Sequence, residues 1–192
     1  MCFAFITEWQ VRRRLRRPMP ESFCAFDDAR RLVLLAQGRD IPSLLPVIGE
    51  LTAAGKKITL VVETRHKNEM PVVIPGCYPI LQLHTSWLWN RPTRQFLQSF
   101  DNNDGEVLLD VSTTRSLALL CLAIHSRAGF KMGIAKREEN PFQLQIIIPE
   151  HRAGSEPDGA VATSGKSRPD AGELLKNMLF YWKKIGVKEN NL

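Results

Sequence analysis

The stretch that most constrains the fold is residues 106–129, EVLLDVSTTRSLALLCLAIHSRAG, in which a strand, a turn and a helix can all be recognised. The run VLLDV is apolar except for Asp110, which is typical of a strand buried on both faces of a parallel sheet. Ser112 or Thr113 can cap the helix that follows, because a hydroxyl accepts hydrogen bonds from the free N–H groups of a first turn. Gly129 is expected to end that helix in a left-handed conformation. The stretch therefore indicates an α/β fold.

A second strand–helix–strand pattern occupies the first third of the chain. The apolar runs RLVLLA (31–36) and ITLVV (58–62) each predict a buried strand, and a helix with an apolar stripe lies between them. Asp40 can cap that helix, and Gly55 can end it. Strand, helix and strand with short connections form a right-handed βαβ unit, so we expect a parallel sheet.

Three further segments complete the predicted sheet. Residues 80–83 are a candidate third strand, and the runs FKMGIA (130–135) and LQIII (144–148) predict two more. Because only the charged turn 136–141 joins these last two strands, we expect the sheet to end in a hairpin.

Length and composition favour one domain. The chain of 192 residues is long enough for a sizeable core, and 44% hydrophobic with 24% charged residues is ordinary for a globular protein. We predict a single Rossmann-like three-layer α/β domain with a mostly parallel sheet over residues 21–149. A basic amphipathic helix (1–20) precedes it, and a flexible loop rich in Gly, Ser and Pro (150–169) follows it. A C-terminal helix (170–192), capped by Asp170, is expected to pack on the core.

The positive charge of the chain is gathered at its N-terminal end. The net charge is +6, and residues 1–20 carry +4 of it. Guanidinium groups on little more than one helical turn can meet several phosphates together, so this helix is a candidate RNA or ribonucleoprotein interface. Two alternatives stay open: the arginines are solvated on a helix that packs on the domain, or Phe and Trp side chains dock it on a membrane surface. The arginines are Arg12, Arg13, Arg14, Arg16 and Arg17.

A second basic and aromatic segment lies in the middle of the chain. Trp87 and Trp89 stand beside Arg91 and Arg94, ahead of a short helix that Thr93 can open. Tryptophan faces can stack on bases, and a guanidinium adds a cation–π contribution. The other interpretation is that the tryptophans anchor a loop against the sheet.

Cysteine, histidine and hydropathy patterns argue against several classes of protein. The four cysteines form no CxxC pair and the four histidines have no metal-ligand spacing, so we predict no metal site. No GxGxxG or GxxxxGK[ST] loop indicates a nucleotide cofactor. Reduced thiols are typical of a cytoplasmic protein, which is the location we expect. No apolar run approaches the roughly 18 residues that a membrane span requires.

Two loops are candidates for a ligand site, because ligands of open parallel sheets lie beyond the carboxyl ends of the strands. The loops are 37–40 and 110–115, and a predicted helix follows each. Backbone N–H groups at a helix N-terminus, hydroxyls and a guanidinium can hold an anion together. The alternative is that the Asp, Ser and Thr residues of these loops only cap helices. The candidate anion-binding residues are Gly38, Asp40, Ser112, Thr113, Thr114 and Arg115.

The sequence resembles an uncharacterised family of short, basic bacterial proteins that is known only as a domain of unknown function. The resemblance covers nearly the whole chain apart from the Gly/Ser-rich loop, and it implies no activity. The segments that carry it are the basic N-terminal helix, LVLLA, WLWNRPTRQFLQSF, EVLLDVS, AGFKMGIA and LQIII.

A more distant resemblance is to the N-terminal half of heptosyltransferase-type glycosyltransferases, which have two Rossmann-like domains. It rests on the segment EVLLDVSTTRSLALL and on a first strand followed by Gly38-Arg39-Asp40, where that family has an uninterrupted Gly-Asp pair. The resemblance implies a Rossmann-like fold, with Asp40 as a candidate catalytic base. The chain has no room for the second domain, which holds the nucleotide-sugar in those enzymes, so the resemblance argues against a complete transferase.

Three functional hypotheses follow from the sequence. The first is a non-catalytic α/β module whose N-terminal arginines bind a polyanion, most plausibly RNA or a ribonucleoprotein such as the ribosome. The second is a small enzyme or sensor that binds a phosphorylated or sugar-nucleotide ligand at the carboxyl edge of the sheet. The third, weaker hypothesis is a protein of the membrane surface.

Overall fold

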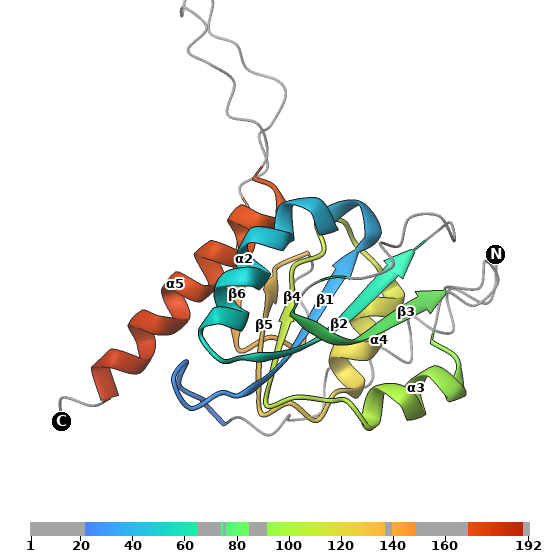
Figure 1. The fold of residues 1–192 in the computed structure, drawn as a ribbon, viewed down its shortest axis with the longest axis horizontal. Helices are drawn as coiled ribbons and strands as arrows, with labels where there is room; N and C mark the ends of the chain where they lie inside the picture. Colours follow the sequence, from blue (N-terminus) through green and yellow to red (C-terminus); the bar gives the residue numbers. More distant parts are fainter. Residues whose placement is uncertain are drawn as a thin grey trace, which may run out of the picture.

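The computed structural model describes residues 22–64, 74, 76–84, 92–136, 140–148 and 169–189. These residues form six strands, four α-helices and one 3₁₀ turn (Figure 1). The strands are β1 (Arg31–Gln37), β2 (Lys57–Thr64), β3 (Cys77–His84), β4 (Val107–Asp110), β5 (Phe130–Ile134) and β6 (Leu144–Ile146). The helices are α2 (Ile41–Ala53), α3 (Arg94–Asp101), α4 (Leu117–His125) and α5 (Ala171–Glu189), and the 3₁₀ turn η1 is Gly38–Asp40.

All six strands belong to one sheet in the order β3-β2-β1-β4-β5-β6, and every neighbouring pair is parallel. This confirms an α/β fold with a parallel sheet, and the sheet is entirely parallel rather than mostly so. Along the chain, β2 and β3 are added on one side of β1, and then β4, β5 and β6 are added on its other side. The connections therefore diverge between β1 and β4.

The predicted hairpin between the last two strands is wrong. β6 runs parallel to β5, with Met132 paired to Leu144 and Ile134 paired to Ile146. The reason lies in the segment that leads into β6, where the buried Phe142 packs directly over Gly133 of β5. A Cβ atom on residue 133 would lie only 2.5–2.7 Å from three atoms of the Phe142 ring. The Phe142 ring thus lies over β5 shortly before the chain enters β6.

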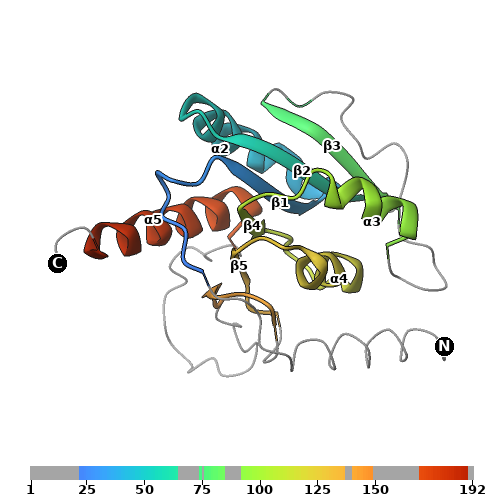
Figure 2. The same ribbon diagram turned by 90° about the horizontal axis from the view of Figure 1, so that it is seen from below.

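Helices cover both faces of the sheet, and each face has its own apolar core. Side chains alternate along β1, so that Leu32 and Leu34 join the core beneath α2 and α5, while Val33 and Leu35 join the core beneath α3 and α4. Figure 2 shows α2 and α4 on opposite sides of the sheet. A strand covered on both faces must be apolar throughout, which explains the unbroken hydrophobic run of β1.

The helix ends only partly follow the predictions. Thr93 caps α3 by accepting from Phe96 N at 3.2 Å, and Asp170 caps α5 by accepting from Glu173 N at 2.8 Å. Gly55 follows α2 with a φ of 78°, the left-handed conformation expected of a glycine after a helix.

The other three helix ends differ from the predictions. Asp40 makes no side-chain capping bond to α2. The cap of α4 is neither Ser112 nor Thr113 but Ser116, whose hydroxyl accepts from Leu119 N at 3.1 Å. Gly129 does not end α4, which stops at His125, four residues earlier. The loop between β4 and α4 is therefore longer than predicted, and its hydroxyl side chains have other partners.

Several predicted features lie outside the described residues. They are the basic helix 1–20 with its five arginines, the segment containing Trp87, Trp89 and Arg91, and nearly all of the loop 150–169. None of the helices in the described ranges combines the length and apolar character that a membrane span requires.

Candidate functional site

The carboxyl ends of the strands bring both predicted loops to one edge of the sheet. β1 and β4 are neighbours, with Leu35 paired to Asp110 at their ends. The chain then leaves β1 for α2 on one face and leaves β4 for α4 on the opposite face. Such a point of divergence is where open α/β sheets bind ligands. We refer to this edge, residues 37–40 and 110–116, as the switch-point edge.

Arg39 connects the two loops. Its Nη2 donates to Gln37 Oε1 at 3.0 Å and to Thr114 Oγ1 at 2.8 Å, with a longer contact of 3.4 Å to Thr113 Oγ1. The side chain is 58% exposed. A guanidinium has five N–H donors, and within the described part of the chain its Nη1 makes no hydrogen bond. Arg39 is therefore held in place by the loops while it still presents donors to solvent.

Asp40 binds the opposite loop instead of capping its own helix. Its carboxylate accepts from Thr113 N at 3.3 Å and from Thr113 Oγ1 at 3.0 Å, and only 8% of the side chain is exposed. Arg39 Nε lies 3.9 Å from Asp40 Oδ1 and balances part of the negative charge. The carboxylate thus fixes the loop of β4 against the end of β1, and its suggested role as a catalytic base stays a prediction.

Glu63, which the sequence analysis did not single out, extends the switch-point edge to the end of β2. It accepts from Gln37 Nε2 at 3.3 Å and from the capping residue Ser116 at 2.7 Å. Gln37 Oε1 in turn accepts from Thr114 Oγ1 at 2.7 Å. One signal could have found Glu63: it is a charged residue directly after the buried run ITLVV, at the edge where ligands of parallel sheets bind.

A second polar group lies beside the first, at the ends of β4 and β5. Asp110 is 4% exposed and accepts from Ser112 N at 3.0 Å and from Ser112 Oγ at 2.5 Å. Lys136, two residues beyond β5, places its Nζ 3.1 Å from Asp110 Oδ2 and also donates to Ser112 Oγ. The ammonium compensates a carboxylate that would be costly to bury alone. Ser112 was predicted to lie at this edge, whereas Lys136 was not.

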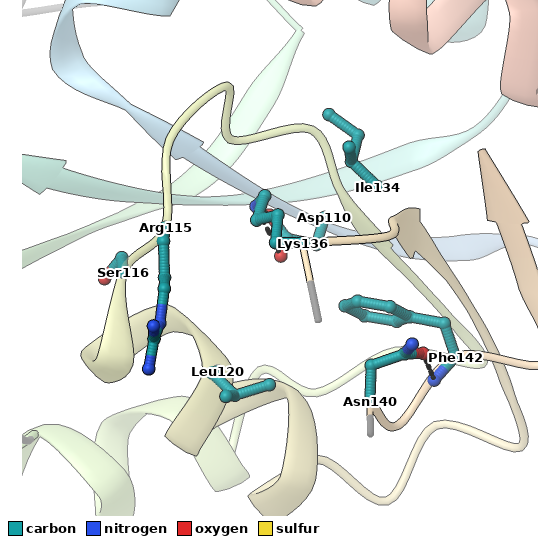
Figure 3. Close-up of a pocket in the computed structure, with 8 residues that line it drawn as sticks. All are labelled: Asp110, Arg115, Ser116, Leu120, Ile134, Lys136, Asn140 and Phe142. Carbon is teal, nitrogen blue, oxygen red and sulfur yellow. Dashed lines mark hydrogen bonds and ion pairs between the residues drawn. The ribbon is translucent and has the colours of Figure 1, made fainter. Parts of the chain in front are cut away.

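A small pocket opens next to this ion pair. The volume available to water is about 20 Å³, which suffices for roughly one water-sized group. Figure 3 shows Lys136 and Asp110 meeting at the centre of the pocket, with Asn140 and Phe142 on one side and Ser116 on another. The lining residues are Asp110, Arg115, Ser116, Leu120, Ile134, Lys136, Asn140 and Phe142.

The opposite edge of the sheet is also basic, but Lys56, a buried cation there, has a structural role. Lys56 Nζ donates to the carbonyl oxygens of Phe26 at 2.6 Å, Ala29 at 2.7 Å and Asp27 at 3.3 Å. Three carbonyl acceptors satisfy the three N–H donors of an ammonium. Lys56 thereby ties the segment before β1 to the start of β2.

The remaining predicted site residues do not join the switch-point edge in the described structure. Arg94 is the exposed first residue of α3, and Arg91 lies outside the described residues. In the described ranges, no three His, Cys, Asp or Glu side chains gather in a way that could hold a metal ion.

Comparison with known proteins identifies the family to which the chain belongs. A family model described as a family of unknown function (DUF6913) matches residues 4–154. No curated protein and no solved structure matches the chain. The match agrees with the resemblance to a domain of unknown function, and the distant resemblance to heptosyltransferase-type enzymes stays a prediction.

Proposed function

We propose that this chain, which belongs to the DUF6913 family of unknown function, is a Rossmann-like domain that binds a small phosphorylated ligand at the switch-point edge. The strand order β3-β2-β1-β4-β5-β6 supports the Rossmann-like assignment, since it is the order of doubly wound dinucleotide-binding sheets. The observation that carries the proposal is the contact of Arg39 with Thr114 across the point where β1 and β4 diverge.

The exposure of the charged side chains favours an anionic ligand. Asp40 and Asp110 are nearly buried, and their carboxylates are engaged by Thr113 and by Lys136. Arg39, in contrast, is largely exposed. At this edge, therefore, the Arg39 guanidinium is exposed to solvent, whereas the Asp40 carboxylate beside it is nearly buried. Guanidinium and threonine hydroxyl groups are common donors to phosphate oxygens.

The arrangement supports ligand binding and assigns no reaction. The Ser112 hydroxyl is fully buried between Asp110 and Lys136, so it is not accessible as a nucleophile. The same residues at the switch-point edge would bind a phosphorylated metabolite in a sensor or carrier and would position the substrate in an enzyme. Binding is therefore the property to test first.

A thermal-shift screen tests the proposal. The panel contains inorganic phosphate, pyrophosphate, nucleoside mono- and diphosphates and sugar phosphates. A ligand at a hundred times its Kd stabilises the folded protein by about 2.7 kcal/mol, which raises the Tm by several degrees. Arg39→Ala is expected to weaken binding by about ten- to a hundredfold, because a hydrogen bond to a charged group is lost.

Arg94→Ala is the matched control, because it removes an exposed arginine on α3 and leaves the switch-point edge intact. Its ligand affinity should equal that of the unmodified protein. The proposal is wrong if no compound in the panel raises the Tm, or if Arg39→Ala and Arg94→Ala bind equally well.

A second candidate function is polyanion binding by the N-terminal segment. It is favoured by the charge of residues 1–20, which carry +4 of the net +6. Such a concentration of arginine would bind RNA largely through phosphate contacts, so affinity should fall steeply with salt. The two functions use different residues, and one chain can have both.

A further inference from the structure

Lys136 is a partly buried cation that lines the pocket beside the switch-point edge. Its side chain is 17% exposed, and its Nζ lies 3.1 and 3.2 Å from the two oxygens of Asp110. The side chain comes from the segment after β5, whereas Arg39 comes from the loop after β1. The pocket thus lies on the far side of β4 from Arg39.

We propose that this pocket is an oxyanion subsite in which Lys136 binds a terminal oxygen of the ligand's phosphate group, and that Asp110 is a built-in counter-ion which weakens this binding. The inference rests on the proposed function and names two of the residues that set its affinity. Neither belongs to the set of anion-binding residues predicted from the sequence.

The size of the pocket fits part of an oxyanion. A volume of about 20 Å³ admits roughly one water-sized group, which is also the size of one phosphate oxygen. The rest of the phosphate would remain outside the pocket. Ser116 lines the pocket and donates to Glu63, so the pocket directly adjoins the network that contains Gln37 and Arg39.

The walls of the pocket strengthen the field of the ammonium. Leu120, Ile134 and Phe142 form its apolar lining, and Figure 3 shows the Phe142 ring beside the ion pair. Charges act more strongly next to apolar walls than in open water. Among the described residues, the charged side chains that line the pocket are Lys136, Arg115 and Asp110.

Asp110 opposes a bound anion because both negative charges share Lys136. With the ammonium about 3 Å from the carboxylate, an oxyanion on the other side of the same ammonium lies within a few ångströms of Asp110. Removal of the Asp110 charge should therefore tighten binding, whereas removal of both charges should abolish it. A variant with a damaged fold would bind the ligand more weakly, so tighter binding after removal of the Asp110 charge cannot be caused by damage to the fold.

Two isosteric variants test the inference with pyrophosphate as the probe and isothermal titration calorimetry as the measurement. Asp110→Asn is expected to bind pyrophosphate about tenfold more tightly than the unmodified protein, since a nearby like charge is removed. The double variant Asp110→Asn/Lys136→Gln removes both charges and leaves no buried charge unpaired, so it should fold. It is expected to lose at least tenfold in affinity. Circular dichroism establishes that each variant is folded.

The outcomes separate this inference from the proposed function. If Arg39→Ala weakens pyrophosphate binding while the double variant binds normally, the ligand site stands and the Lys136 subsite is wrong. Weaker binding by a folded Asp110→Asn also overturns the role of Asp110. If pyrophosphate binds to neither the unmodified protein nor any variant, including Asp110→Asn, the Lys136 subsite is wrong, and the other compounds of the thermal-shift panel decide the proposed function.

Discussion

Glu106 joins the start of β4 to the segment before β1. Its carboxylate accepts from Arg30 N at 2.6 Å, from Arg31 N at 3.1 Å and from Arg31 Nε at 3.3 Å. The hydrogen bond from the Arg30 backbone is the main cause of a lowered pKa, and the bonds from Arg31 add to it, while desolvation opposes them. Each of these bonds is strongest with the ionised carboxylate.

The lowered pKa of Glu106 predicts a loss of stability in acid. The unfolded chain has a pKa near 4.5, and the folded protein has a lower one, so the folded state favours the ionised form. This contribution is complete above the unfolded pKa and disappears as the pH falls through the folded pKa. Glu106→Gln should lower the free energy of unfolding at pH 7 by about 1 kcal/mol, a value reduced for the partial exposure of the side chain. Urea denaturation at pH 7 and at pH 3 measures the difference.

The matched control is Glu50→Gln on the exposed side of α2, which should change stability by less than about 0.5 kcal/mol. As the pH falls through the lowered folded pKa, the Glu106→Gln variant should approach the stability of the unmodified protein, because Glu106 becomes protonated in both states. An equal loss at both pH values would show that the ionised form is not the stabilising one.

At the scale of elements, the ring of Phe142 packs against Gly133 of β5 just before β6 joins the sheet. Gly133→Ala would place a methyl group against the ring of a buried phenylalanine. Overpacking of this kind costs about 1–3 kcal/mol. We expect Gly133→Ala to lower the free energy of unfolding by that amount, as measured by chemical denaturation.

Two further variants make this prediction specific. Gly49, inside α2, has no atom within 4 Å of a Cβ added there, so Gly49→Ala should stabilise the protein by about 0.5–1 kcal/mol. Phe142→Leu should recover part of the stability of Gly133→Ala, because a smaller side chain makes room for the methyl group. Additive losses in the double variant would argue against the contact.

Local chemistry explains which elements could be predicted from the sequence. Thr93 and Asp170 cap helices by binding backbone N–H groups three residues away, and Gly55 ends the helix directly before it. The local sequence was therefore sufficient to predict these helix ends. Ser112 and Thr113 looked like caps, but their hydroxyls bind carboxylates on Asp110 and Asp40. The partner of Thr113 lies 73 residues away, so a sequence pattern does not show it, whereas Ser112 binds Asp110, only two residues before it.

The predicted hairpin failed for the same reason. A charged segment between two short strands is typical of a turn, and the packing of Phe142 over Gly133 depends on the sheet as a whole. The site shows a similar division. The rule that ligands bind at the carboxyl ends of parallel strands was enough to predict that the two loops lie at one edge of the sheet. It did not indicate that Lys136 or Glu63 would lie there.

At the scale of the whole molecule, most of the net positive charge lies in the sequence ahead of the described residues. The six-stranded sheet and its helices lie in residues 22–189, while most of the net charge lies in residues 1–20. We therefore expect that separate variants can remove the proposed polyanion binding and the proposed ligand binding. Changes in one should leave the other intact.

Replacement of Arg12, Arg13, Arg14, Arg16 and Arg17 by glutamine tests the polyanion function. If all five arginines pair with phosphates of single-stranded RNA, the logarithm of affinity should fall with the logarithm of salt concentration with a slope of about −3.5. The glutamine variant should lose this binding, as measured by fluorescence anisotropy with a labelled RNA. Lys183→Gln/Lys184→Gln on α5 is the control with two exposed cations removed. Salt-independent binding, or full binding by the five-residue variant, would contradict the function.

The helix α5 begins 17 residues after the family match ends, yet it supplies Leu174, Leu175, Met178 and Trp182 to the core over α2. Trp182 is fully buried, and its indole N–H donates to Cys24 O at 2.7 Å. The boundary of shared sequence is thus not the boundary of the folding unit. A protein that stops at residue 154 would lack α5, so the apolar surface that α5 covers would be exposed to solvent. Expression of relatives should therefore include the residues that follow the family match.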